Sequence, residues 1–154
     1  MDIRTDHLDH PAVIALLRDH LGALAQLSPA ESMHALDVGR LKSPDVMFWS
    51  AWDGDEVMGC AALKFLDANH AELKSMRTAP NHLRRGVASA LLRVALDEAR
   101  RRGCARVSLE TGTAPGFVAA HTLYRRTGFV DCAPFASYVD DPHSTFMTLE
   151  LAPA

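Results

Sequence analysis

The sequence predicts an α/β fold, with a mixed, mostly antiparallel central sheet of about seven strands flanked by about four helices. Two observations predict it. Within residues 46–66, two apolar, aromatic-rich runs flank the turn sequence DGDE, a pattern typical of an antiparallel hairpin. From residue 70 onward, strand-like and helix-like segments alternate. Because the chain has 154 residues, 48% of them hydrophobic, we expect a single domain over residues 1–154.

The N-terminal part predicts one short strand and two helices before the hairpin. Residues 2–7 form the strand, and residues 11–27 carry apolar side chains at helical spacing. In the second helix, residues 28–41, Ser28 is a suitable N-cap and Pro29 occupies the first helical position.

The strand that follows the hairpin, residues 70–80, ends at Pro80. Strict alternation along this strand places Glu72, Lys74 and Met76 on one face of the sheet. The later elements are a long amphipathic helix, a strand, a second helix, a connection that includes a further strand, and a last strand: residues 83–103, 105–111, 116–128, 129–143 and 144–151.

Composition and charge narrow the range of functions. The formal net charge of −3 argues against a protein that binds nucleic acid mainly through phosphate contacts. No apolar run approaches the roughly 20 residues of a membrane-spanning helix, and the polar N-terminus is unlike a signal peptide. We therefore expect a cytoplasmic protein without a membrane partner. The basic run Arg100–Arg102 with Arg106 is expected to be a solvated helix cap.

Neither the cysteines nor the histidines predict a metal site. Cys60, Cys104 and Cys132 are far apart, which fits small reduced core residues better than disulfides or zinc ligands. The densest group of potential ligands is the sequence DHLDH, residues 6–10, and no second ligand cluster accompanies it. We expect it to be a polar loop that leads into a helix.

An anion site is predicted where the long helix begins, at the sequence LRRGVAS, residues 83–89. The first turn of a helix leaves backbone N–H groups without partners, and the helix dipole adds partial positive charge there. Gly86 offers a close approach to the backbone, and Arg84 and Arg85 add charge and hydrogen-bond donors. A ligand that carries a pyrophosphate is therefore plausible, although a merely solvated basic loop is the alternative.

The strand AELKSMRTAP, the loop NHLRRGVA, the helix SALLRVALDEARRRG, the strand RVSLET and the segment LYRRTGF together resemble the GCN5-related N-acetyltransferase (GNAT) superfamily, small bacterial type. The resemblance spans about residues 46–151. The pyrophosphate loop of that family reads [Q/R]-x-x-G-x-[G/A], and Gly86 and Ala88 match its last two fixed places. Leu83 departs from the first place, so Arg84 or Arg85 would have to substitute for its side chain.

The resemblance implies acetyl-CoA as cosubstrate and no metal. It also implies that the two strands flanking the long helix splay apart to admit the pantetheine arm, which the first of them holds through its backbone. The Met76 N–H would polarise the thioester carbonyl. The implied cofactor-binding residues are Met76, Arg77, Thr78, Arg84, Arg85, Gly86, Val87, Ala88 and Ser89.

The segment LYRRTGF matches the family pattern LYxxxGF, so the resemblance makes Tyr124 the general acid for the departing thiolate. A tyrosine with a pKa near ~10 keeps its proton at neutral pH. The alternative is a tyrosine packed between helix and sheet with its hydroxyl satisfied. Phe117 replaces an asparagine common in the family, so a cofactor amide contact is lost or made elsewhere, and Arg125 and Arg126 are candidates for the 3′-phosphate.

The general base is predicted to be Glu72 or Glu110, because burial beneath a sheet raises the pKa of a carboxyl group. By the resemblance, Glu72 matches a strand glutamate that serves as base in histone-type relatives. Either carboxylate could instead be structural, paired with Lys74 or with an arginine, and deprotonation through water is a further alternative.

The acceptor is expected to be a primary amine of a small molecule. Its pocket is expected to be framed by residues 26–41, 46–66 and 133–143, with Glu31, His34, Phe135 and Tyr138 as the candidate substrate-binding residues. A peptide or protein N-terminus is the alternative acceptor. An acyl-CoA-binding sensor without catalysis is the alternative of another class. Homodimers through sheet edges are common in the family and are compatible with this sequence.

Overall fold

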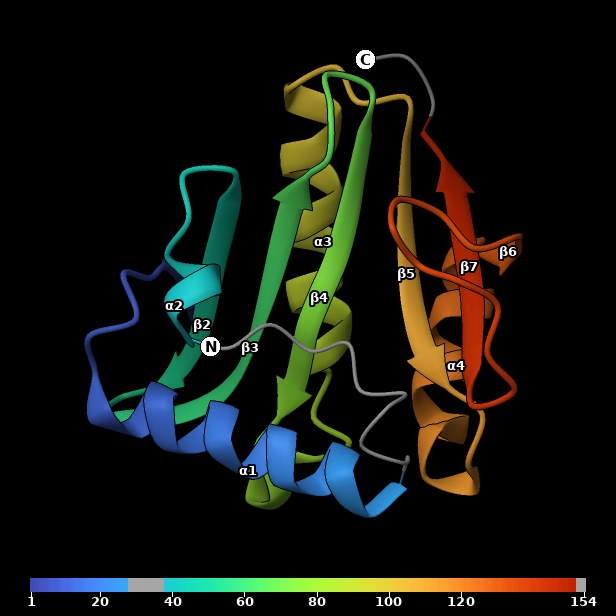
Figure 1. Cartoon of the computed structure of the whole chain (residues 1–154). Helices are drawn as coiled ribbons and strands as arrows, with labels where there is room; N and C mark the ends of the chain where they lie inside the picture. The colour runs from blue at the N-terminus through green and yellow to red at the C-terminus, as the bar shows by residue number, and fades with distance from the viewer. Residues whose placement is uncertain (28–37, 152–154) are drawn as a thin grey trace.

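A computed structural model of the chain describes residues 1–27 and 38–151 (Figure 1). Its seven strands form one sheet in the order β1-β2-β3-β4-β5-β7-β6, which confirms the predicted strand count. The strands are β1 (Asp2–Thr5), β2 (Val46–Asp53), β3 (Glu56–Phe65), β4 (His70–Thr78), β5 (Arg106–Gly112), β6 (Val130–Asp131) and β7 (Ser144–Glu150). The helices of the described part are α1 (Pro11–Leu27), α2 (Val38–Leu41), α3 (Val87–Arg101) and α4 (Val118–Thr127), with 3₁₀ turns η2 (Pro80–His82) and η3 (Pro115–Phe117). Of the helix predicted over residues 28–41, α2 is present and residues 28–37 lie outside the described residues.

The predicted hairpin is confirmed. Strands β2 and β3 are antiparallel, and Asp53 pairs with Glu56 across the turn formed by Gly54 and Asp55. Gly54 has a φ of 58°, a left-handed conformation that glycine adopts without steric cost from a Cβ atom. Strand β4 continues this antiparallel arrangement, whereas β4 and β5 are parallel and β5 and β7 are antiparallel. The sheet is therefore mixed and mostly antiparallel, as predicted.

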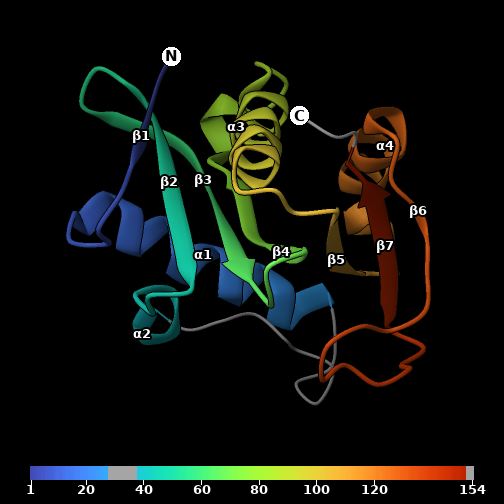
Figure 2. The same ribbon diagram turned by 90° about the horizontal axis from the view of Figure 1, so that it is seen from above.

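Helices cover both faces of the sheet. Figure 2 shows α3 and α4 on one face and α1 and α2 on the other. The long amphipathic segment places its apolar positions at helical spacing, so one stripe of α3 faces the sheet. Each fully buried aliphatic side chain of such a stripe stabilises the fold by about 1.5–3 kcal/mol. The buried residues of α3 are Val87, Leu91, Leu92, Ala95, Leu96 and Ala99.

Strand β4 contains a β-bulge at Ser75. Cys60 pairs with Arg77 and Ala62 pairs with Lys74, so Ala61 of β3 lies opposite two residues of β4. Ser75 has a φ of 54°, which is uncommon for a residue with a side chain. A bulge of this kind inserts one extra residue and reverses the faces of all residues that follow it.

The predicted alternation along this strand is therefore wrong beyond the bulge. Glu72 and Lys74 share a face, as expected, but Met76 packs against the core cluster on the α3 side. Arg77 pairs with Cys60, a member of the core cluster on the α1 side. No pattern of polar and apolar residues marked the bulge, because both faces of β4 are covered.

The basic run at the end of α3 pairs with acidic residues of the same helix. Arg100 Nη1 lies 3.3 Å from Asp97 Oδ1, and Arg101 and Arg102 both contact Glu98, at 2.6 and 2.9 Å. These contacts agree with the predicted solvated helix cap. In the part of the chain that the structure describes, no helix is long and apolar enough to cross a membrane.

Asp6 and His10 of the N-terminal sequence DHLDH form structural hydrogen bonds. Asp6 accepts from the Leu8 N–H at 2.7 Å and from the Ser50 hydroxyl at 2.6 Å, and His10 Nδ1 accepts from the Ala12 N–H at 3.0 Å. These bonds fasten the loop to β2 and to the start of α1. Within residues 1–27 and 38–151, no group of three or more His, Cys, Asp or Glu side chains is arranged to hold a metal ion.

Candidate functional site

The parallel strands β4 and β5 are paired over only part of their length. His70 pairs with Arg106, and the ladder ends where Glu72 pairs with Ser108, although β4 continues to Thr78 and β5 to Gly112. Figure 1 shows the two ribbons diverging towards their tips, as the resemblance implies. Beyond Glu72, the backbone N–H and C=O groups on the edge of β4 that faces β5 are therefore not paired with β5.

The loop before α3 ends in a left-handed N-cap. Gly86 has a φ of 78° and a ψ of 13°, and its carbonyl accepts the Ala90 N–H at 3.0 Å, which begins the hydrogen-bond pattern of α3. The N–H groups of the first helical turn lie ahead of this bond and have no helical acceptor. An added Cβ at Gly86 would meet nothing within 4 Å, so the glycine is needed for its φ and not for free space at this point.

Arg84 also lies in a left-handed conformation, with a φ of 64°. Arg84 and Leu83 are exposed, whereas Arg85 directs one guanidinium nitrogen, Nη1, to within 2.8 Å of His82 Nδ1. Two cationic residues therefore directly precede Gly86, the N-cap of α3. The donors and the positive charge at this helix end suit a phosphate group.

Tyr124 lies on α4 with only 6% of its surface exposed and packs 5.7 Å from the ring of Phe129. Burial raises the pKa of Tyr124 to about 12, so the hydroxyl keeps its proton at neutral pH. Within residues 1–27 and 38–151, this hydroxyl has no hydrogen-bond partner. Tyr124 is thus packed in the core, as in the alternative interpretation, whereas its hydroxyl is not bonded to any side chain or backbone group of the described residues.

The first turns of α4 are fixed to the end of β5. The Phe117 ring lies against Gly112, where an added Cβ would come within 2.1 Å of it. His121 Nε2 donates a hydrogen bond of 2.8 Å to the Gly112 carbonyl. Phe117 therefore fills a structural position where relatives often have asparagine, and His121 serves as an anchor of the helix.

Glu72 belongs to a buried polar cluster with Lys74 and Tyr138. The Glu72 side chain is 4% exposed and that of Lys74 is 8% exposed. Glu72 Oε2 accepts from the Tyr138 hydroxyl at 2.5 Å and from Lys74 Nζ at 3.0 Å, and Lys74 Nζ also donates to the Tyr138 oxygen at 2.8 Å. The structure thus contains the pairing with Lys74 that the sequence left as an alternative. Burial, followed by the Glu72 carboxylate, raises the pKa of the Tyr138 hydroxyl.

Tyr138 also belongs to an aromatic cluster. The Phe135 ring lies 5.1 Å from that of Tyr138 and 6.0 Å from that of Phe146, while Tyr138 and Phe146 are 5.6 Å apart. Phe135 also lies 5.6 Å from the ring of His70, whose pKa is lowered, chiefly by burial. Residues 132–143 are thereby held against the sheet where the β4–β5 pairing ends.

Glu110 lies on the part of β5 that no longer pairs with β4. Its Oε2 accepts a hydrogen bond of 2.9 Å from the Ser144 hydroxyl, and the carboxylate contributes to the raised pKa of Tyr138. The structure therefore brings Glu72, Glu110, Phe135 and Tyr138 into one region, although they come from separate segments of the sequence. Glu31 and His34, the other predicted substrate-binding residues, lie outside the described residues.

Two polar side chains of this region have surroundings that the sequence did not predict, although Arg77 was implied as a cofactor-binding residue through its backbone. Arg77 has a buried Nε atom without a hydrogen-bond partner among the residues described. His82 is 3% exposed and bridges two charged side chains. Neither spacing nor periodicity could indicate them, because the bulge sets the face of Arg77 and a long-range contact with Glu56 sets the role of His82.

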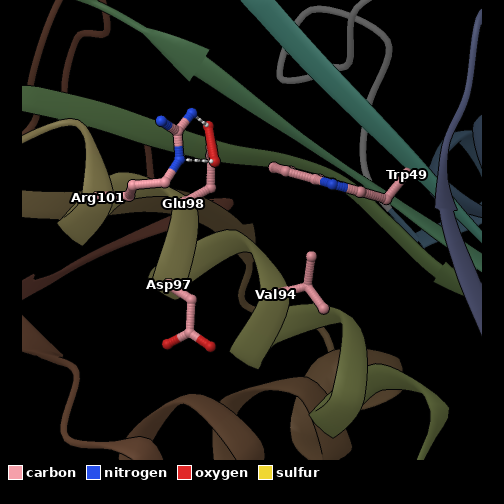
Figure 3. A pocket seen from close by; sticks show the side chains of 5 residues that line it. All are labelled: Trp49, Val94, Asp97, Glu98 and Arg101. Carbon is pink, nitrogen blue, oxygen red and sulfur yellow. Dashed lines mark hydrogen bonds and ion pairs between the residues drawn. The ribbon is translucent and has the colours of Figure 1, made fainter.

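A surface pocket lies elsewhere, between β2 and α3 (Figure 3). It is lined by Trp49, Val94, Asp97, Glu98 and Arg101. Hydrogen bonds from Arg101, opposed in part by burial and assisted by Arg102, lower the pKa of Glu98 to about 2. Because this carboxylate is already paired and the pocket lies near the C-terminal half of α3, it does not belong to the site at the other end of the helix.

Comparisons with known proteins agree with this geometry. The sequence model of the acetyltransferase (GNAT) family matches residues 13–129. The chain is 58% identical to the uncharacterized N-acetyltransferase YedL of Escherichia coli strain K12, over 97% of this chain and 94% of the relative. It is 49% identical to the uncharacterized N-acetyltransferase YsnE of Bacillus subtilis strain 168, over 98% of this chain and 100% of the relative.

Solved structures share the fold. A putative acyl-CoA N-acyltransferase from Klebsiella pneumoniae superposes with a TM-score of 0.78 at 26% identity, covering 98% of this chain and 97% of that one. An aminoglycoside 6′-N-acetyltransferase solved in complex with coenzyme A has a TM-score of 0.74 at 16% identity, with 100% and 99% of the two chains covered. The expected fold class is thereby confirmed. The chain belongs to the acetyltransferase (GNAT) family and is an N-acetyltransferase by class.

Proposed function

We propose that this chain transfers the acetyl group of acetyl-CoA to a primary amine of a small molecule, by direct attack of the amine on the thioester. The observation that carries the proposal is the separation of β4 and β5 after Glu72 and Ser108, together with the α3 N-terminus capped by Gly86. A strand edge with unused backbone groups suits the amides of a pantetheine arm. A helix start with free N–H groups suits the pyrophosphate joined to that arm.

The residues present fit the cosubstrate in three places. The pyrophosphate is held by residues 84–89, through backbone N–H groups and the guanidinium groups of Arg84 and Arg85. The pantetheine arm lies along the backbone of residues 76–78, beyond the bulge. Arg125 and Arg126 at the end of α4 are the candidates for the 3′-phosphate, and Arg125 is exposed and pairs with Asp131 at 3.1 Å.

The reaction forms a C–N bond and breaks the C–S bond of the thioester. The Met76 N–H stabilises the oxyanion that develops on the thioester carbonyl. The sulfur leaves as a thiolate and receives the proton of the Tyr124 hydroxyl, whose high pKa keeps that proton available at neutral pH. The neutral amine loses one proton to a base as the C–N bond forms, and a proton from solvent restores the Tyr124 hydroxyl after the thiol is released.

Glu110 is the better candidate for this base of the two carboxylates. Glu72 Oε2 already accepts hydrogen bonds from Lys74 and Tyr138 inside a buried cluster, so these contacts occupy that oxygen. Glu110 is half-buried and lies on β5 beyond the last paired residues, with a hydrogen bond from Ser144. Relay through a water molecule remains the alternative route to Glu110 or to solvent.

A small acceptor is favoured over a peptide by the position of residues 132–143. Tyr138 fastens this segment to Glu72 on β4, and Ser144, directly after it, is fastened to Glu110 on β5. Both contacts connect the segment to the two strands that separate, so it forms a wall on that side. A wall of this kind suits a compact amine and obstructs an extended chain.

Thiol release from acetyl-CoA in the presence of a panel of small amines and short peptides tests the proposal. We expect release with at least one small amine and little release with peptides of unrelated sequence. Release with peptides alone would support the alternative acceptor. Calorimetric binding of coenzyme A without release on any acceptor would support a sensor, and no binding at all would overturn the assignment of residues 84–89 to the pyrophosphate.

A further inference from the structure

His82 bridges two charged side chains at the loop before α3. It is 3% exposed and lies in η2, with Nε2 2.9 Å from Glu56 Oε1 and Nδ1 2.8 Å from Arg85 Nη1. A guanidinium group only donates hydrogen bonds, so Nδ1 must accept. The imidazole proton then resides on Nε2, which donates to Glu56. The geometry therefore defines one neutral tautomer of His82.

Glu56 anchors this bridge to the hairpin. It is the first residue of β3, directly after the hairpin turn, and pairs with Asp53. The side-chain amide of Asn81 donates to the same Oε1 atom. The hydrogen bond from His82, followed by that from Asn81, lowers the pKa of Glu56, so the carboxylate stays charged at neutral pH. The chain of contacts runs from the hairpin through His82 to Arg85.

We infer that His82 is a positioning residue for Arg85, which it holds at the pyrophosphate-binding loop. This inference rests on the proposed function, because Arg85 is one of the residues assigned to the pyrophosphate of acetyl-CoA. The neighbouring Arg84 is exposed and, among residues 1–27 and 38–151, has no side-chain hydrogen bond or ion pair. Arg84 therefore provides a matched arginine whose orientation does not depend on His82.

Two amide substitutions separate the two halves of the bridge. In His82→Asn, the side-chain oxygen takes the approximate place of Nδ1 and can still accept from Arg85, while the donor to Glu56 is lost. In His82→Gln, the side-chain N–H takes the approximate place of Nε2 and can still donate to Glu56, while the acceptor for Arg85 is lost.

We expect His82→Gln to weaken the binding of coenzyme A, measured by calorimetry, about tenfold, as for the loss of one hydrogen bond to a charged group. We expect His82→Asn to bind nearly as the wild type, and kcat at saturating acetyl-CoA to be unchanged in both.

A double-mutant cycle tests whether the effect passes through Arg85. In an Arg85→Ala background, His82→Gln should cause no further loss of affinity. In an Arg84→Ala background, it should cause the full loss. Equal weakening by Asn and Gln, or a full loss in the Arg85→Ala background, would overturn the positioning role in favour of a general structural one. Absence of coenzyme A binding by the wild-type protein would instead overturn the proposed function.

A measurement on the wild-type protein does not depend on any variant folding. The ¹⁵N chemical shifts of the His82 ring at neutral pH should be those of the Nε2–H tautomer, with an unprotonated Nδ1. A ring protonated on Nδ1 cannot accept from Arg85. That result would overturn the inference even if every variant were unstable.

Discussion

The Tyr138 hydroxyl donates to Glu72 Oε2 at 2.5 Å, and this bond joins residues 132–143 to the last residue of β4 that pairs with β5. The same carboxylate oxygen accepts from Lys74 at 3.0 Å. Buried charges are stable only when they are paired and hydrogen-bonded. We therefore propose that the cluster fixes the point where the two strands begin to separate, and that Glu72 serves the shape of the site more than its proton chemistry.

Glu72→Gln should lower stability because it removes the carboxylate charge that pairs with the buried Lys74 ammonium. Loss of one partner from a buried ion pair costs about 3–5 kcal/mol, and both side chains are less than one-tenth exposed. Denaturant unfolding followed by circular dichroism measures the change in the free energy of unfolding. Tyr138→Phe is the control, since it removes the hydrogen bonds of the hydroxyl with Glu72 and Lys74 and leaves the ion pair, and it should cost about 1–3 kcal/mol. An unfolding free energy for Glu72→Gln equal to that of the wild type would contradict the structural role.

Glu110→Gln should lower kcat with little effect on stability. General-base catalysis contributes about 10²–10⁴-fold to a rate, and Glu110 is half-buried on the part of β5 that does not pair with β4. Steady-state kinetics with a responsive amine, at several pH values, measure the loss. Ser144→Ala is the matched control, because it removes the hydrogen bond and keeps the carboxylate. If Glu110→Gln retained activity while a folded Glu72→Gln lost it, the base would be Glu72.

The fold could be predicted because its signals are local. The hairpin turn at Gly54, the apolar stripe of α3 and the left-handed Gly128 that ends α4 can each be identified within a few neighbouring residues. The separation of β4 and β5 was implied only by the family resemblance, because strand pairing is a long-range property.

The bulge at Ser75 could not be predicted, since an extra residue in a strand covered on both faces leaves no break in the polar pattern. As a result, the sequence placed Met76 on the wrong face. The contacts of Tyr138 with Glu72 and of His82 with Glu56 join residues distant in sequence, so their chemistry became visible only in the structure. The sequence named Glu72, Glu110 and Tyr138 as candidate site residues, but it did not predict the contact between Glu72 and Tyr138.

Replacing Arg84 and Arg85 together by Ala should weaken the binding of coenzyme A, and the difference from the wild type should be larger at low salt. Both arginines are exposed and directly precede the N-cap of α3, and exposed charges are screened within about 10 Å at 0.1 M salt. Calorimetric titration at two ionic strengths measures the effect. Arg100→Ala is a suitable control, because this arginine lies at the opposite end of the same helix and pairs with Asp97. An affinity loss that did not depend on salt would contradict an electrostatic role for the pair.

Tyr124→Phe should lower kcat about 10²-fold or more, while the affinity for coenzyme A stays close to that of the wild type, because the hydroxyl acts on the departing thiolate and not on the bound cosubstrate. The pKa of Tyr124 is raised to about 12, so its ionisation should not limit kcat below pH 10.

The raised pKa of Tyr124 also predicts a difference in stability at alkaline pH. An unfolded tyrosine ionises near ~10 and the folded one near 12, so this residue stabilises the fold below pH 10 and the contribution is lost as the pH rises through about 12. Denaturant unfolding at pH 9 and pH 11 should therefore show a steeper loss of stability for the wild type than for Tyr124→Phe. Parallel losses, together with an unchanged kcat, would exclude Tyr124 as the general acid.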